Sequence, residues 1–294
     1  MPRPLTLDDL PEVERLLCAG FPERSAAFWR KGLARMLAQR DHGGHGDQGS
    51  QGARGRTGFP WGFGLESDGR LVGVALTPAT ERRRADGSVH TLVNLAGWTI
   101  EPDHRWRALA MLRRMLADPQ SAYIDLTPSP AVQRMLPHVG LQRVAATTAV
   151  LLLPGHAAGS ARGARLRPLP VGQAPALGPT ALLLDAHRAL GCEPLLLRHA
   201  DGEDLLVWRR STLRGLPAAQ LVYVQSHAVL LRHLPVLARH LLGQGRLLLQ
   251  CDSRITGPDR WHTFYRPYGA WFARGADFSD HTDFLGSERC LFGV

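Results

Sequence analysis

The segment whose residue types and spacing most clearly indicate a chemical role runs from Val89 to Leu116, with the sequence VHTLVNLAGWTIEPDHRWRALAMLRRML. An apolar strand leads through the loop Glu101–His104 into a helix that opens at Arg105. Backbone N–H groups at a helix N-terminus have no partner within the helix, and the helix dipole favours negative charge there. A strand that leads into such a helix start is therefore a predicted pyrophosphate site.

This stretch resembles the acyl-CoA-binding motif of the GNAT acyltransferases (GCN5-related N-acetyltransferases), V-x-P-x-x-R-G-x-G-x-G/A. Pro102 and Arg105 fall where that family has them, and Ala110 is an accepted final residue. Trp106 and Ala108 replace the usual glycines, which allow a ligand to approach the backbone closely. The alternative is an ordinary strand-helix unit whose arginines are only solvated.

The resemblance implies that acetyl-CoA, or another acyl-CoA, is the co-substrate, and that an amine or hydroxyl group of an acceptor attacks its thioester. Main-chain groups near the end of the long strand would contact the pantetheine, at Trp98, Thr99 and Ile100. The residues that would hold the pyrophosphate are consecutive: Arg105, Trp106, Arg107, Ala108, Leu109 and Ala110. No metal is expected.

The acid and base of such a reaction are not evident. Asn94 stands at the place where the family often has a basic glutamate, and an amide cannot act as a base. His90 lies four residues earlier on the same strand face, although a lone histidine on a strand is more often structural. Tyr123 and Asp125 share one face of the next strand and are further candidates, but Tyr123 is equally explained as a core residue.

The elements around the motif follow the GNAT order over about residues 3–154: strand, two helices, three strands, helix, strand, helix, strand. Thr6, Ser25 and Ser129 are expected helix caps, and Ser67-Asp68-Gly69 is a hairpin turn between two strands. The apolar run Val144–Leu153 is expected to be one strand, buried on both sides.

A similar, fainter pattern follows. It has a hairpin about Ala200-Asp201-Gly202, an apolar helix over Val229–Leu242 and a last strand over Glu288–Phe292. The segment Gln225–Leu230 lacks the motif's glycines and is expected to be a packed junction rather than a second acyl-CoA site. The alternative to a second GNAT-like domain is a generic α/β cap on the first half.

The expected fold class is therefore α/β (an α+β mixed sheet), with two GNAT-like domains in tandem and the second degenerate. The first domain is expected over residues 1–154 with a mobile loop at 41–56, the linker over 155–162, and the second domain over 163–294. The aromatic segment at 261–272 is expected to form core of the second domain, with an acceptor pocket as the alternative.

The formal charge of +9 does not by itself indicate nucleic-acid binding, because the arginines are scattered and do not alternate with aromatic residues. The one tight cluster, Arg82-Arg83-Arg84, is expected at a solvated hairpin tip. The four cysteines are far apart, which argues against a zinc site or disulfides and suits a reducing cytoplasm. No segment is apolar enough to predict a membrane span.

The sequence thus favours a cytoplasmic enzyme, an acyl-CoA-dependent N-acyltransferase with a small-molecule or peptide acceptor. The rival is a non-catalytic GNAT-like protein that binds acyl-CoA or a partner. Neither the acceptor, the acyl length nor the oligomeric state can be read from the chain.

Overall fold

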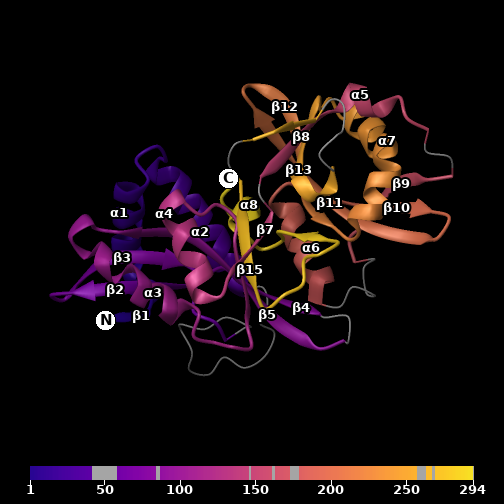
Figure 1. Cartoon of the computed structure of the whole chain (residues 1–294). Coiled ribbons are helices and arrows are strands. Elements are labelled where there is room, and N and C mark those ends of the chain that lie inside the picture. Colours follow the sequence, from indigo (N-terminus) through magenta and orange to yellow (C-terminus); the bar gives the residue numbers. More distant parts are fainter. Residues whose placement is uncertain are drawn as a thin grey trace. The chain divides into compact units, whose positions relative to one another are not determined.

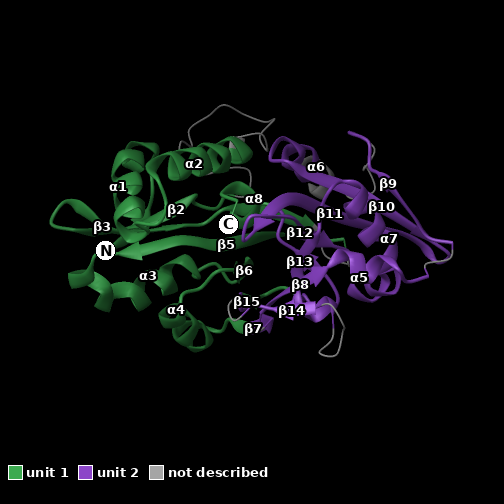
Figure 2. Cartoon of the chain, turned by 90° about the horizontal axis from the view of Figure 1, so that it is seen from above, with its two compact units in different colours: residues 1–142, 272–276, 286–294 green, residues 143–271, 277–285 purple. Residues whose placement is uncertain are grey.

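The computed structural model describes residues 1–41, 58–83, 87–145, 147–160, 163–172, 179–256, 263–266 and 269–293 (Figure 1). The loop expected at 41–56 lies outside the described residues, apart from Asp41. The chain forms two compact units, coloured separately in Figure 2. Unit 1 comprises residues 1–142, 272–276 and 286–294, and unit 2 comprises residues 143–271 and 277–285.

This division differs from the one expected at residues 154–163. Residues 143–154 belong to unit 2, and two C-terminal segments belong to unit 1. The physical reason lies in strand pairing, because β8 (Thr148–Leu152) forms an antiparallel ladder with β13 (Leu248–Asp252). The C-terminal strand β15 (Trp271–Arg274) pairs instead with β6 (Ala122–Asp125) through Phe272–Arg274.

In unit 1 the long strand β5 (Val89–Ile100) lies beside β6 in the order β1-β2-β3-β5-β6-β15-β7, and β4 also pairs with β5. The strands β5 and β6 run parallel. The remaining strands of this sheet are β1 (Pro2–Pro4), β2 (Gly62–Ser67), β3 (Arg70–Leu76), β4 (Ala79–Arg83) and β7 (Gln142–Ala145).

Helices cover both faces of this sheet. The helices α1 and α2 lie on one side and α3 and α4 on the other, as Figure 2 shows. Their bounds are α1 (Leu10–Gly20), α2 (Ala26–Asp41), α3 (Ala108–Met115) and α4 (Pro130–Met135), with the short α8 (Glu288–Leu291) at the C-terminal end.

The local starts and turns follow the sequence signals. Thr6 and Asp9 form a capping box ahead of α1, and the Oγ of Ser25 accepts a hydrogen bond from the backbone N–H of Phe28 in α2. Ser129 caps α4 by accepting from the N–H of Val132. Between β2 and β3, Asp68 and Gly69 have φ values of 50° and 74°, as a tight hairpin turn requires.

From β9 to β13, unit 2 follows the order strand, helix, three strands, helix, strand. Its sheet has the order β14-β8-β13-β12-β11-β10-β9, with β16 added on β12. The apolar face of α7 packs on this sheet, since Leu230, Leu234, Leu237 and Leu241 are buried in one cluster with Trp208. The elements are α5 (Leu153–Ala157), β9 (Arg165–Pro168), α6 (Pro179–Ala189), β10 (Cys192–His199), β11 (Gly202–Leu213), β12 (Leu216–Val224), α7 (His227–Gly243), β14 (Thr263–Tyr265) and β16 (Thr282–Asp283).

Three local expectations are wrong. The run Val144–Leu153 is not one strand, because β7 ends at Ala145 and β8 begins at Thr148 in the other sheet. The expected last strand Glu288–Phe292 is the helix α8. Arg82 is not solvated but only 5% exposed, and its guanidinium donates to the Oγ1 of Thr80 at 2.8 Å. Within the described residues, no helix has the length and apolar character needed to cross a bilayer.

Candidate active site

The parallel ladder between β5 and β6 ends halfway along β5. It pairs Leu92 with Ala122 at one end and Leu95 with Asp125 at the other. Beyond Leu95, β5 continues to Ile100 and pairs only with β3 on its other edge, among the residues that the structure describes. Main-chain N–H and C=O groups on such an open edge can bond the amides of an extended ligand. The open edge includes Trp98, Thr99 and Ile100, whose main-chain groups are the ones expected to contact pantetheine.

A β-bulge at Gly97 shapes the strand where this edge opens. The register with β3 shifts between Val74 and Leu76, and Gly97 has a φ of 51°. This positive φ favours glycine, and a Cβ on Gly97 would lie 3.0 Å from the Cδ1 of Leu76, which would have to shift to admit it. Bulges redirect side chains, and Trp98, the next residue, lines the adjoining cavity.

That cavity has a volume of about 280 Å³ and is the candidate site. Four segments of unit 1 line it: the turn between α1 and α2 with the start of α2, the end of β5, the stretch from β6 into α4, and α8. Aromatic and acidic side chains are its main features, namely Phe21, Phe28, Trp29 and Trp98 with Glu23, Asp125 and Glu288, beside Arg24. It is large enough for the reacting end of a thioester together with a small amine.

Two carboxyl groups, of Asp125 and Glu288, line this cavity, and the charge of Glu288 acts on Asp125. Burial raises the pKa of Asp125 well above its ordinary value, and the neighbouring Glu288 raises it further. Burial also raises the pKa of Glu288, to about 7, while a hydrogen bond from the Thr127 hydroxyl at 2.7 Å opposes that rise. Two like charges are disfavoured at such a place, so ionisation of one carboxyl group opposes ionisation of the other.

Asn94 positions this pair rather than reacting. It is 2% exposed, and its Oδ1 accepts a hydrogen bond of 2.8 Å from the backbone N–H of Glu288. Its Nδ2 donates at 3.3 Å to the carbonyl of Ile124 on β6. The amide thus joins β5, β6 and the start of α8, which carries Glu288 into the cavity from 194 residues further along the chain.

Glu288 is the residue that the sequence analysis missed as a candidate. Its segment was expected to be a strand of the second domain, so nothing connected its carboxyl group with Asp125. The available signal was a single glutamate within the largely apolar end LGSERCLFGV. Buried glutamates are rare without a partner or a function, which is why burial marks this one.

Among the candidates for the acid and base, Asp125 lines the cavity, whereas Tyr123 and His90 do not. Tyr123 is fully buried, and its hydroxyl donates to the carbonyl of Asp118 at 3.0 Å, so it is a core residue. His90 pairs across the ladder with Arg82 near the beginning of β5 and does not line the cavity. Thr99 packs toward the end of α1, where a Cβ on Gly20 would clash with its side chain.

The expected pyrophosphate segment follows β5 but is not a regular α-helix from Arg105. Residues Pro102–Arg107 form a 3₁₀ helix, and α3 begins only at Ala108. The N–H of His104 donates to Glu101 at 2.9 Å, and the N–H of Ala108 donates to Arg105. Arg105 and Trp106 are exposed, whereas Arg107, Ala108 and Leu109 are half-buried and Ala110 is exposed.

The corresponding place in unit 2 is filled by the chain itself. The strands β12 and β13 pair in parallel only from Ala218 to Gln220, but β16 then covers β12 at Tyr223 and Val224. At the start of α7, the N–H of His227 donates to the carbonyl of Asp280 at 2.8 Å, and Ser226 bonds the Asp280 carboxylate. A carboxylate at this helix start disfavours a phosphate there by charge repulsion, in agreement with a packed junction.

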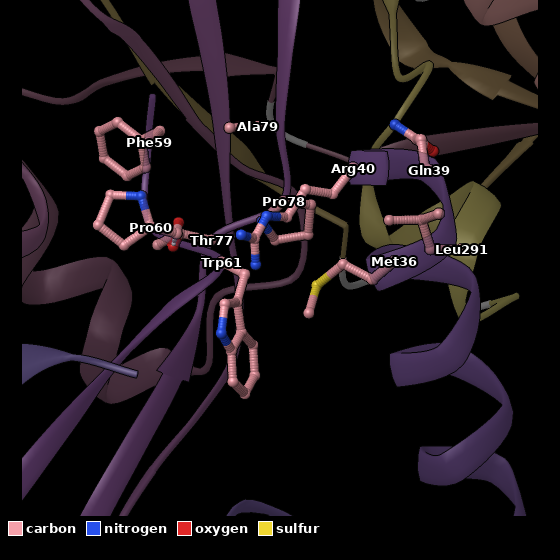
Figure 3. A pocket seen from close by; sticks show the side chains of 10 residues that line it. All are labelled: Met36, Gln39, Arg40, Phe59, Pro60, Trp61, Thr77, Pro78, Ala79 and Leu291. Carbon is pink, nitrogen blue, oxygen red and sulfur yellow. Dashed lines mark hydrogen bonds between the residues drawn. The ribbon is translucent and has the colours of Figure 1, made fainter. Parts of the chain in front are cut away.

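A second cavity in unit 1 is too small to hold a substrate. Figure 3 shows side chains of α2, of the segments flanking β2 and β3, and Leu291 of α8 around it. Its volume of about 20 Å³ suits a single water molecule. Across the described part of the chain, no group of three or more His, Cys, Asp or Glu side chains is arranged to hold a metal ion.

Solved structures share this fold. A GCN5-related N-acetyltransferase from Anabaena variabilis is 11% identical, with a TM-score of 0.58 over 93% of this chain and 72% of that one. The corresponding protein from Kribbella flavida is 13% identical, with a TM-score of 0.55 over 93% and 70%. A conserved protein of unknown function from Enterococcus faecalis is 9% identical, with a TM-score of 0.53 over 93% and 72%. No family model and no curated protein matches the sequence.

The chain therefore has the fold of the GCN5-related N-acetyltransferases, and its described residues form two mixed sheets of eight strands each. The resemblance seen in residues 89–116 is confirmed at the level of fold. At identities of 9–13% the likeness does not extend to a reaction or a substrate. Those must be argued from the site itself.

Proposed function

We propose that this chain is an acyltransferase that moves an acyl group, most simply acetyl, from coenzyme A to an amine. The observation that carries the proposal is one cavity that combines an open strand edge after Leu95 with the carboxyl pair Asp125 and Glu288. The edge suits the amides of pantetheine, and the pair suits proton transfer at a thioester.

Acyl-CoA, the co-substrate, would supply the activated carbonyl group. Different parts of the chain would bind the pantetheine and the phosphates of this co-substrate. The main-chain groups of Ala96 to Ile100 on the strand edge that β6 leaves open would hold the pantetheine. The basic side chains Arg105 and Arg107 would contact the phosphates. Phe21, Phe28 and Trp29 would enclose the apolar body of the acceptor, while Glu23 adds a negative charge that favours an amine over a hydroxyl compound.

The carboxyl pair accounts for both proton transfers. The nitrogen of a neutral amine forms a bond with the thioester carbon, and the carbon–sulfur bond breaks to release the thiolate. Glu288, as the ionised member, takes the proton that the nitrogen loses, and Asp125, as the protonated member, gives one to the thiolate. A proton passing from Glu288 to Asp125 restores the starting state, and the products are an amide and free coenzyme A.

A thiol-release assay with acetyl-CoA and a panel of primary amines tests the proposal. General acid-base catalysis contributes about 10²- to 10⁴-fold, so Glu288→Gln and Asp125→Asn should each lower kcat by that range. Glu203→Gln, which removes an exposed carboxylate of unit 2, is the matched control and should retain the wild-type rate. Full activity in both pair variants would refute the proposed roles.

One observation favours the rival function, a protein that binds acyl-CoA without turnover. Trp106 and Ala108 replace glycines, and two N–H groups of their segment are already bonded within it. Coenzyme A binding without thiol release for any amine would support that rival.

We further propose that the protein acts in a reducing cytoplasm, because all four cysteines are free thiols. We propose a small molecule or a peptide as the acceptor.

A further inference from the structure

We propose that Trp106 is a stacking platform for the adenine base of coenzyme A, and that Arg105 and Arg107 beside it hold the phosphates through their side chains. The inference rests on the proposed function, since it assigns the nucleotide half of the same co-substrate. It gives a role to the residue that departs most from the glycine pattern.

The exposure of Trp106 is the first observation. Its side chain is 81% exposed, whereas the other large apolar residue of the turn region, Ile100, is buried at 7%. An exposed indole presents a broad apolar face to water, and nucleic-acid bases stack on such faces with little dependence on sequence. The Cζ of Arg107 lies 5.9 Å from the ring centroid, so a cation already adjoins the platform.

The unpaired charge of the two arginines is the second observation. The only hydrogen bond of the Arg105 side chain within the described residues is a long one, 3.5 Å from its Nε to the carbonyl of Ile100. Neither Arg105 nor Arg107 forms an ion pair with a carboxylate in the described part of the chain. Glu101, which directly follows β5, is instead bonded by Arg15 and Arg70. Asp103 is the one acid inside the turn, and it forms no ion pair with either arginine in the described part of the chain. Both guanidinium groups can therefore bind an anion.

The 3₁₀ helix explains why side chains take over this task. In a glycine-containing loop, backbone N–H groups can turn toward a phosphate. Here the N–H groups of His104 and Ala108 are bonded to carbonyls of the turn itself. The turn also follows directly on Ile100, at the end of the open β5 edge, where the nucleotide end of an extended coenzyme A would emerge. The geometry therefore assigns the base to Trp106 and the phosphates to the arginines.

Calorimetric titration of the full-length chain tests the proposal with two probes, coenzyme A and 4′-phosphopantetheine, which lacks the nucleoside. Base–aromatic stacking corresponds to roughly 5- to 100-fold in affinity, so Trp106→Ala should weaken coenzyme A binding by that factor. It should leave phosphopantetheine binding unchanged, and Trp106→Phe should restore much of the loss. Arg105→Gln and Arg107→Gln should weaken coenzyme A binding and reduce its dependence on salt.

Phe264→Ala is the matched control, because Phe264 is an aromatic residue of unit 2 that is 61% exposed. It should bind coenzyme A as the wild type does. Equal coenzyme A affinity in the wild type and Trp106→Ala would overturn the inference and leave the proposed function standing. A wild type that binds phosphopantetheine and coenzyme A equally would also overturn it. A wild type that binds neither probe would refute the proposed function itself.

Discussion

Replacing Glu288 with glutamine should make the protein more stable than the wild type, and this difference in the free energy of unfolding should grow as the pH rises. The folded state raises the pKa of this carboxyl group from 4.5 to about 7, chiefly by burial. Below pH 4.5 the group is protonated in both states and has no effect on the balance. Between pH 4.5 and 7 the unfolded chain loses the proton and the folded chain keeps it, so the free energy of unfolding falls with rising pH.

The size of the effect follows from the shift. One pKa unit corresponds to 1.36 kcal/mol, so the buried carboxyl group lowers the stability by up to about 3 kcal/mol above pH 7. Glutamine has nearly the same shape, can still accept from Thr127 through its Oε1, and does not ionise. Removal of the Glu288 charge also eases the ionisation of Asp125, which acts in the same direction.

Urea unfolding at pH 5 and pH 8 measures the difference between variant and wild type. We expect the Glu288→Gln variant to be more stable than the wild type by under about 1 kcal/mol at pH 5 and by up to about 3 kcal/mol at pH 8. Glu203→Gln is the control, because a hydrogen bond from Arg198 lowers the pKa of that exposed carboxyl group below 4.5. The group is then ionised in both the folded and the unfolded chain from pH 5 to pH 8, so this variant should differ from the wild type by the same amount at both pH values. A stability difference for Glu288→Gln that is the same at both pH values would refute the burial argument, whatever the activity of the variant.

Four further outcomes are expected. Asn94→Ala should cost about 1–3 kcal/mol in urea unfolding at pH 7, because it leaves the buried N–H of Glu288 without its acceptor, and a loss below 0.5 kcal/mol would contradict that role. Gly97→Ala should lower the stability by about 1–3 kcal/mol through its φ of 51° and the contact with Leu76, whereas Gly69→Ala has a similar φ but open space and should cost less in the same assay. Calorimetry should give one acetyl-CoA per chain, since β16 covers β12 in unit 2, and two equal sites would refute this. A fragment of residues 1–156 lacks β15 and α8 of unit 1 and should be poorly soluble, so a soluble fragment with a cooperative melt would contradict the expectation.

Local sequence signals determined much of unit 1. The strand Val89–Ile100 has the bounds expected from its apolar pattern, and the hairpin at Asp68-Gly69 and the caps Thr6, Ser25 and Ser129 lie where their chemistry placed them. These features depend on residues within a few positions of one another, so the sequence contains the whole cause. The spacing of Pro102 and Arg105 and the order of the elements were likewise visible in the sequence, and together they indicated the correct fold.

Tertiary structure alone decided which strand belongs to which sheet and where the acid–base pair is built. The run Val144–Leu153 is uniformly apolar and could not show that β8 pairs with β13, because partner choice depends on edges formed by distant segments. The meeting of Asp125 with Glu288 is equally non-local, since Asn94 holds the start of α8 from another strand. The raised pKa values exist only because folding removes both carboxyl groups from water, which no pattern of neighbours along the chain can express.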